Sequence, residues 1–300
     1  MTLVVVGSVA LDTIETPAAC RENVLGGSAV YFSYAASFFT HVHLVGAVGD
    51  DWQPDFTRLL AERQIDLAGL RQIAGGKTFR WRGKYHANMN DRETLEVHLN
   101  VLEQFDPVLP ETYRACQWLF LGNASPGVQL RVLEQVHAPR LVLADTMDLW
   151  INIQRDELCE LLRRIDALVL NDSEARLLAD DDNLIRAGRA VRAMGPKFVV
   201  IKKGEHGAML FGERETYVLP AYPTAEVVDP TGAGDSFAGG FLGWLAMQEE
   251  LTSGALKQAL ASGIVVASFA VEGFSLDGLR RLSRADIDRR LDEYRRMTRF

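Results

Sequence analysis

A short glycine-rich segment followed by a carboxylate is the part of this sequence best suited to chemistry. Residues 229–235 read Asp-Pro-Thr-Gly-Ala-Gly-Asp. Gly232, Ala233 and Gly234 leave their backbone N–H groups uncovered by side chains. Apolar residues at helical spacing follow from Phe237, so the segment opens a helix, and helix N-termini attract anions. We therefore predict a phosphate-binding loop at these three residues.

Asp235 places a negative charge at the edge of this loop, where it would repel a phosphate. One interpretation is catalytic, because an alcohol that attacks a γ-phosphoryl group must be oriented and must lose its proton. The other is structural, because an acidic residue in the first turn of a helix complements the helix dipole. Asp235 by itself favours neither.

The whole segment resembles the C-terminal signature of the ribokinase-like, or PfkB, family of carbohydrate and nucleoside kinases. The resemblance extends over essentially the whole chain. It implies ATP-dependent phosphorylation of an alcohol hydroxyl on a sugar or sugar derivative, with Asp235 as base and Gly232, Ala233 and Gly234 as anion hole. A nucleoside kinase of the same family is the first alternative, and a non-catalytic sugar-binding paralogue is the second.

The resemblance also implies where the acceptor binds. An aspartate after the first strand, Asp12, and a paired glycine, Gly26 and Gly27, match the family's sugar-binding positions. Many relatives carry an asparagine a few residues later, whereas this chain has Val-Tyr-Phe-Ser at 30–33. Tyr31 or Ser33 could replace that amide, although the same pattern is expected of a core helix.

Further positions are implied on the nucleotide side. Asn171 and Glu174 match the family's Asn-x-x-Glu element, in which Glu174 acts on Mg²⁺ through water, although the same residues are typical of a helix capping box. The remaining nucleotide-binding candidates are Lys203, Gly204, Thr231 and Ser262. The stretch 271–274 resembles one that holds a monovalent cation such as K⁺ in some relatives.

Composition limits the partners and the compartment. The chain has 300 residues, a formal net charge of -8 and a pI near 5.3, which argues against binding of nucleic acid or an anionic membrane surface. Its partners are therefore expected to be ATP and a small sugar or nucleoside. Three widely spaced cysteines, together with an N-terminus that does not resemble a signal peptide, predict a cytoplasmic protein.

Alternating strand and helix patterns predict the architecture. Buried strands are expected at 3–9, 42–48, 118–121, 141–144, 167–170 and 198–201, and helices at 29–39, 54–63, 128–136, 157–164, 185–194, 236–247, 256–270 and 286–297. This order predicts an α/β, doubly wound, mostly parallel sheet flanked by helices, forming one ribokinase-like domain over residues 1–300. The site should lie at the carboxyl ends of the strands.

Two segments break this alternation and predict a small β lid, built from about 13–25 and 76–101. Residues 78–101 alternate at period two around a polar turn, which is typical of a hairpin. A basic face of Arg80, Arg82 and Lys84 could meet a phosphoryl group, or the aromatic residues Phe79, Trp81 and Tyr85 could stack on the acceptor. A homodimer formed through the lid, as is common in the family, is the expected assembly.

Overall fold

The structure, a computed structural model, describes residues 2–90 and 92–299, and within them two sheets form. The large sheet has nine strands in the order β13-β12-β11-β10-β9-β8-β1-β4-β5. Its strands are β1 (Thr2–Val6), β4 (His41–Val48), β5 (Asp66–Gln72), β8 (Trp118–Leu121), β9 (Leu141–Asp145), β10 (Ala167–Asn171), β11 (Phe198–Lys202), β12 (Ala208–Phe211) and β13 (Thr216–Leu219).

The pairing in this sheet is parallel from β5 to β11, and only β12 and β13 run antiparallel. This arrangement confirms the predicted α/β sheet. The predicted strand at 3–9 ends earlier, at Val6, because the chain turns there and enters the second sheet at Ala10. Strands β5, β12 and β13 were not predicted.

Helices cover both faces of the sheet. Their bounds are α1 (Ser28–Ala36), α2 (Pro54–Glu62), α3 (Pro126–Leu133), α4 (Asp148–Ile153), α5 (Arg155–Leu162), α6 (Asp172–Ala179), α7 (Leu184–Ala193), α8 (Ala233–Leu245), α9 (Ser253–Ala270), α10 (Asp277–Arg280) and α11 (Arg284–Met297), with short 3₁₀ turns η1 (Asn100–Leu102), η2 (Glu111–Tyr113) and η3 (Gly204–His206). One apolar core includes α1, α8, α9 and α11, and a second includes α3, α5, α6 and α7.

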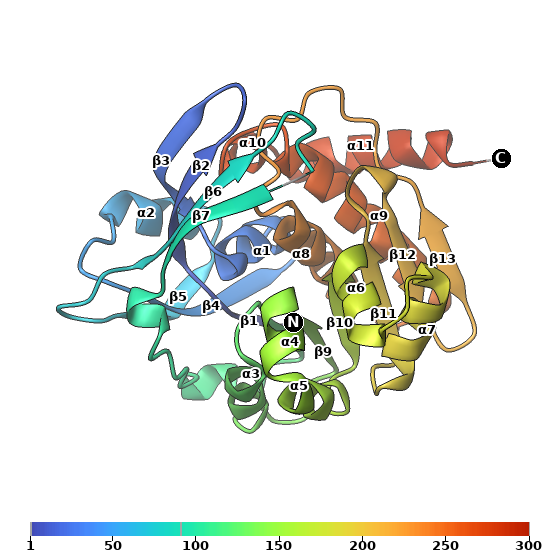
Figure 1. The fold of residues 1–300 in the computed structure, drawn as a ribbon, viewed down its shortest axis with the longest axis horizontal. Coiled ribbons are helices and arrows are strands. Elements are labelled where there is room, and N and C mark those ends of the chain that lie inside the picture. The colour runs from blue at the N-terminus through green and yellow to red at the C-terminus, as the bar shows by residue number, and fades with distance from the viewer. Residues whose placement is uncertain (1, 91, 300) are drawn as a thin grey trace.

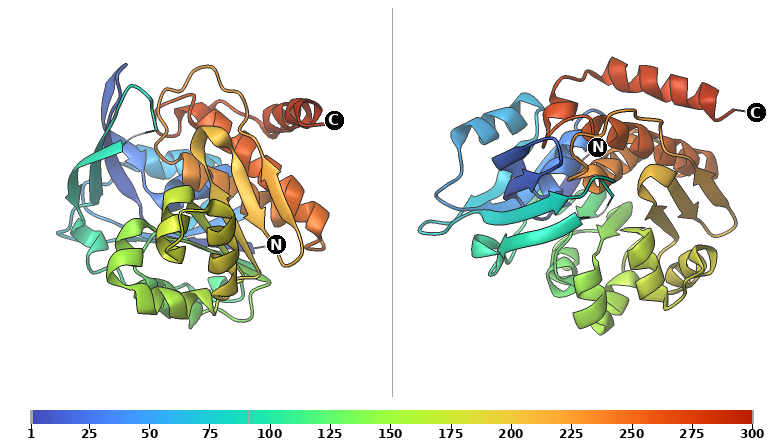
Figure 2. Two further views of the ribbon diagram at one scale, coloured as in Figure 1. Left: turned by 45° about the vertical axis from the view of Figure 1, so that its right-hand side comes forward. Right: turned by 45° about the horizontal axis from the view of Figure 1, so that its top comes forward.

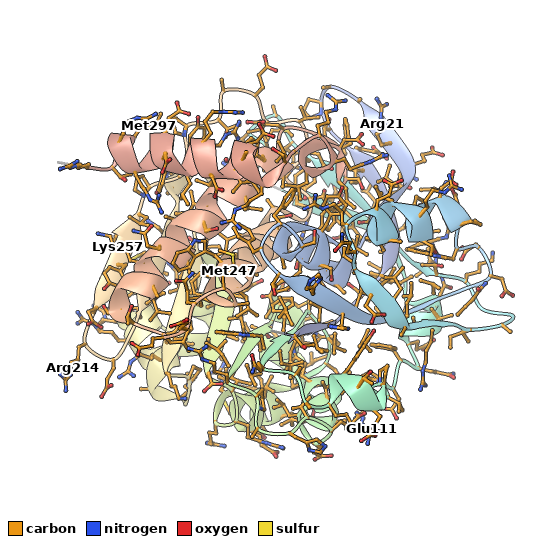
Figure 3. The ribbon with its side chains drawn as sticks, turned by 180° about the vertical axis from the view of Figure 1, so that it is seen from behind. Arg21, Glu111, Arg214, Met247, Lys257 and Met297 are labelled. Carbon is orange, nitrogen blue, oxygen red and sulfur yellow. The ribbon has the colours of Figure 1, made fainter. Side chains whose placement is uncertain are left out.

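Strand β1 shows how one buried strand serves both cores. Leu3 and Val5 belong to the first core and Val4 and Val6 to the second, as expected when successive side chains point to opposite faces. Figure 1 shows α8 near the centre of the molecule, and Figure 3, the reverse view, marks α11 and α9 by Met297 and Lys257.

The small sheet has the strand order β3-β2-β6-β7. Its strands are β2 (Ala10–Glu15), β3 (Cys20–Gly26), β6 (Phe79–Tyr85) and β7 (Arg92–His98). It lies beside the large sheet at the upper left of Figure 1, and Figure 2 shows the same separation from two other sides. Ile14 and Tyr85 of this sheet pack with Phe274, so a small apolar cluster joins the sheet to the C-terminal part of the body.

Helix α9 is long and apolar enough to cross a membrane by composition alone, but 67% of it is buried inside the protein. Its buried side chains include Leu260, Val265 and Val266 of the first core. This is the pattern of a core helix in a globular protein.

Candidate active site

Three neighbouring parallel strands end in polar side chains at the same edge of the large sheet. Strand β9 ends at Asp145, β10 at Asn171 and β11 at Lys202. The Nζ atom of Lys202 lies 3.7 Å from Oδ2 of Asp145. The side chain of Lys202 is only 17% exposed, so its ammonium group lies close to the carboxylates around it and away from solvent.

The glycine-rich segment lies directly above Lys202 at the start of α8. Gly232 is the N-cap residue and has a left-handed backbone, with φ of 72°. A Cβ added at Gly234 would lie 2.9 Å from Nζ of Lys202. The first amides of a helix have no partner within the helix, so this end of α8 offers donors beside a buried ammonium group. This combination of amide donors and positive charge is suited to an anion.

Asp235 stands in the first turn of α8 and is half-buried. Burial, followed by repulsion from Asp145, raises the pKa of Asp235 to about 7, although Lys202 and Arg92 act in the opposite direction. Burial alone would lower the pKa of Lys202, but attraction to Asp145, Glu174 and Asp235 raises it. Lys202 therefore remains charged, and Asp235 titrates near neutral pH.

Asn171 and Glu174 form the capping box of α6. The side chain of Asn171 accepts a hydrogen bond from the amide of Glu174 at 2.8 Å, and Glu174 accepts one from the amide of Asn171 at 2.7 Å. Burial, partly offset by Lys202, raises the pKa of Glu174 to about 7. The capping interpretation is thus confirmed, and it leaves Glu174 within electrostatic range of Lys202 and Asp145.

Asp12 lies inside strand β2 and is 3% exposed. Its carboxylate occupies the space above Gly26, where an added Cβ would meet Oδ2 of Asp12 at 1.9 Å. Gly27 has φ of 97°, and a Cβ there would lie 2.4 Å from the carbonyl oxygen of Ser8. The paired glycine is therefore required by close approach of the backbone to Asp12 and to the turn that follows β1.

The segment before the glycine-rich loop is fixed by Asp229. Its carboxylate accepts hydrogen bonds from the amides of Thr231 at 2.8 Å and Ser275 at 3.1 Å. The hydroxyl of Thr231 donates to that of Tyr85 on β6 at 3.1 Å. Burial, followed by repulsion from Asp229 and Asp235, raises the pKa of Asp12 to about 8. Asp12, Asp229 and Asp235 thus form an acidic cluster.

Two of the three residues of the basic face predicted on the small sheet pair with neighbouring carboxylates. Arg80 pairs with Asp51 at 2.8 Å, and Nε of Arg82 donates to Glu15 at 2.9 Å. The positive charge that the small sheet directs at Asp235 is Arg92, whose guanidinium also lies 5.5 Å from the centre of the Trp81 ring. Sequence reasoning did not select Arg92.

The other nucleotide-side candidates are less closely grouped. Lys203 lies in a turn, where its amide donates to the carbonyl of Gly207 at 2.8 Å, and it is Lys202 that faces the carboxylates. Gly204 lies beside the turn of the small sheet, where Asn90 hydrogen-bonds Glu205 at 2.9 Å. Ser262 is fully buried on α9 in the first core.

Lys202 and Asp145 are the site residues that sequence reasoning missed. Both are the last residue of a buried apolar strand, and both strands were predicted to end one residue earlier. A charged residue that ends such a run, on neighbouring parallel strands, is the signal that could have found them. Arg92 gave no comparable signal, because its approach to the site depends on tertiary structure.

Comparison with known proteins agrees with this geometry. The model of the pfkB family of carbohydrate kinases matches residues 2–277. The chain belongs to this family. It is 31% identical over 247 residues to the cytidine kinase of Thermococcus kodakarensis, covering 80% of this chain and 87% of the relative. As a member of this family, the chain is an ATP-dependent sugar or nucleoside kinase.

Solved structures of family kinases show the same fold. The nucleoside kinase of Burkholderia thailandensis in complex with inosine superposes with a TM-score of 0.80 at 20% identity, covering 97% of both chains. The aminoimidazole riboside kinase of Salmonella enterica, complexed with aminoimidazole riboside and an ATP analogue, gives a TM-score of 0.77 at 20% identity and covers 97% of this chain and 100% of its own. The ribokinase-like architecture, including the small sheet, is thereby confirmed.

Proposed function

We propose that this kinase transfers the γ-phosphoryl group of ATP to an alcohol hydroxyl of a sugar moiety, with Asp235 as the general base. The observation that carries this proposal is the environment of Asp235, which is close enough to both Lys202 and Asp12 to interact electrostatically with each and has a pKa raised to about 7. A carboxylate with this pKa is about half ionised at neutral pH, and its ionised form is a stronger base than an ordinary aspartate.

The neighbouring residues are assigned complementary roles. The amides of Gly232, Ala233 and Gly234, with the charge of Lys202, stabilise the transferring phosphoryl group, and Arg92 adds charge from the small sheet. Asp12, Gly26 and Gly27 hold the acceptor, because they form one packed unit beside Asp235. The residues assigned to the nucleotide are Asn171, Thr231, Lys203, Gly204 and Ser262.

The proposed metal ion is Mg²⁺, and the carboxylate assigned to it lies near the anion site. Among the described residues, no group of three or more His, Cys, Asp or Glu side chains could hold a metal alone. Mg²⁺ fits such a site when it keeps several waters and binds the nucleotide phosphates, where it would neutralise their charge. Glu174 is assigned to it through water. We also propose that residues 271–274 bind a monovalent cation such as K⁺.

A nucleoside is the second candidate acceptor besides a sugar derivative. The names of two relatives favour it, since one is a cytidine kinase and another an aminoimidazole riboside kinase, 31% identical over 242 residues. Trp81 does not offer a stacking surface to a base, because its ring packs on Gly83 and beneath Arg92.

The proposed setting is a cytoplasmic homodimer formed through the small sheet. Support comes from β7, an edge strand whose side chains are all exposed where described. Val97 and Leu95 are 49% and 39% exposed and stand on one face, with Leu99 at 46% in the same alternation.

The experiment that tests the function measures ADP release by the purified protein with ATP and Mg²⁺. Free sugars, sugar phosphates and nucleosides are supplied one at a time, and the product is identified by mass spectrometry. We expect one sugar or nucleoside to gain a single phosphoryl group. ADP release that is the same with and without every acceptor would contradict the proposal.

A further inference from the structure

The hydroxyl of Tyr31 is a fully buried polar group with no hydrogen-bond partner among the described residues. Tyr31 is 1% exposed and lies in α1, four residues after Gly27. Buried hydroxyls in folded proteins are almost always paired. An unpaired one beside a reaction site indicates a partner that is not part of the chain, such as a ligand.

The ring of Tyr31 is fixed against the anion loop. A Cβ added at Gly232 would meet three carbons of this ring at 2.3–2.4 Å, so the ring lies flat on the left-handed glycine that begins α8. The ring would have to leave Gly232, and so open the contact between α1 and the loop, before its hydroxyl could reach another partner. Its position is therefore built into the site.

The surroundings of this hydroxyl are negative or neutral. The pKa of Tyr31 is raised by burial first, and then by Asp12 and Asp229, with smaller effects of Tyr85 and Asp235. Two of these neighbours already have partners, because Asp229 binds two amides and Tyr85 binds Thr231. Asp235 is assigned to the reacting hydroxyl, so Asp12 and Tyr31 remain as the pair that can hold another hydroxyl of the ligand, Asp12 as acceptor and Tyr31 as donor.

This pair fits a neutral alcohol better than an anion. A hydroxyl on the acceptor can donate to a carboxyl oxygen of Asp12, whether or not Asp12 is protonated, and accept from Tyr31 at once. A phosphate or carboxylate would instead be desolvated beside the buried carboxyl groups of Asp12 and Asp229, and any ionised member of this pair would repel it. The positive charges of Lys202 and Arg92 act on Asp235, where the phosphoryl group is transferred.

We propose that the hydroxyl of Tyr31 donates a hydrogen bond to the acceptor, and that the Tyr31–Asp12 pair selects an uncharged polyhydroxyl group over a phosphorylated or carboxylated one. This inference rests on the proposed function, because it assigns the acceptor class of the same site. It makes Tyr31 a specificity-determining residue of this chain.

The test compares Tyr31→Phe with Tyr34→Phe. Tyr34 is equally buried on the same helix, but its ring packs near Phe38 and Arg63 instead of the loop. Acceptors are supplied in pairs that differ in charge, ribose with ribose 1-phosphate and cytidine with cytidine 3′-monophosphate. We expect turnover only with uncharged members, and an acceptor KM raised about 2- to 13-fold in Tyr31→Phe, the value of one neutral hydrogen bond. The KM for ATP should not change, and Tyr34→Phe should match the wild type.

Calorimetric titration of the same acceptors without ATP gives a second readout. A charged member as the best substrate, or an acceptor KM and affinity unaffected by Tyr31→Phe, would overturn the inference while leaving the kinase assignment intact. Binding of an uncharged acceptor that depends on Tyr31, without any phosphoryl transfer, would instead overturn the proposed function alone. If no uncharged acceptor binds the folded wild type, the inference is wrong.

Discussion

Asp235 combines partial exposure with a pKa raised to about 7, chiefly by burial and by repulsion from Asp145. An exposed aspartate at a helix N-terminus would be a much weaker base, because the helix dipole lowers its pKa. The pKa of Asp235 differs from that of such an aspartate because Asp145 and Lys202, which come from other strands, lie near it. The chemistry of this residue is therefore set by tertiary structure, although its identity was evident in the sequence.

The raised pKa predicts how activity depends on pH. The base must be unprotonated to accept a proton, so kcat/KM for the acceptor should fall as pH decreases through about 7. Well below this value the fall should be about tenfold per pH unit, measured by ADP release with saturating ATP. A profile that stays flat from about pH 5 to pH 8 would show that no group with this pKa is required.

Asp12 predicts a pH dependence of stability. Its pKa is about 8 in the folded protein, against an ordinary value of 3.8. From about pH 4 to pH 8 the unfolded chain releases this proton and the folded chain keeps it, so the stabilisation that is present at low pH is lost as pH rises. Asp12→Asn cannot titrate. The melting temperature of Asp12→Asn should therefore rise relative to that of the wild type as pH increases from about 5 to 8.5. A difference between the two melting temperatures that does not change with pH would contradict this pKa.

At the scale of elements, the start of α8 determines whether the anion site can exist. Gly234 leaves room for Lys202, the last residue of β11, to approach the loop. The loop and the ammonium group are thus a single unit assembled from a helix and a strand. This explains why Lys202, which the sequence analysis missed, belongs to the same site as the glycine-rich signature at 229–235.

Gly234→Val should separate this unit. The added side chain would begin 2.9 Å from Nζ of Lys202, so the ammonium group must move away from the loop. We expect the KM for ATP to rise and kcat to fall by about 10²-fold or more, as when one transition-state donor is lost. Gly254→Val in the first turn of α9 is the matched control, since the nearest atom to its added Cβ is 3.8 Å away. Equal kinetics for both variants, with a lower melting temperature for Gly234→Val, would mean that the loop is only structural.

The sequence predicted the buried parallel strands well and the ends of those strands poorly. Continuous apolar runs such as 198–201 identify a strand buried on both faces, but periodicity does not say whether the charged residue that follows belongs to it. Lys202 and Asp145 were missed for this reason. Strand β12 was missed because its four residues follow a glycine-rich turn that was assigned to nucleotide binding. The hairpin of the small sheet was predicted because its alternation at period two is explicit.

At the scale of the whole molecule, the edge strand β7 of the small sheet exposes two large apolar side chains, Leu95 and Val97, on one face. Isolated exposed apolar residues are common, but several on one face of an edge strand favour pairing with another chain. A dimer would bury Val97 and its neighbours and would fix the sheet that carries Arg92 and Tyr85. Assembly and catalysis would then be linked through the same strands.

The assembly is tested by light scattering. The wild type should have twice the chain mass of 33.3 kDa, and Val97→Glu should shift the mass toward one chain at the same concentration. Val218→Glu on the edge strand β13, where Val218 is 58% exposed, is the control and should leave the mass unchanged. A wild type with the mass of one chain would rule out the dimer.

The most direct test of the whole account is the turnover of Asp235→Asn with the preferred acceptor. The amide keeps the shape of the carboxylate but cannot take a proton, so kcat should fall by about 10²- to 10⁴-fold while ATP affinity stays nearly constant. Nucleotide titration on the same preparation shows that the site is intact. Full turnover in this variant would contradict the assignment of Asp235 as the base.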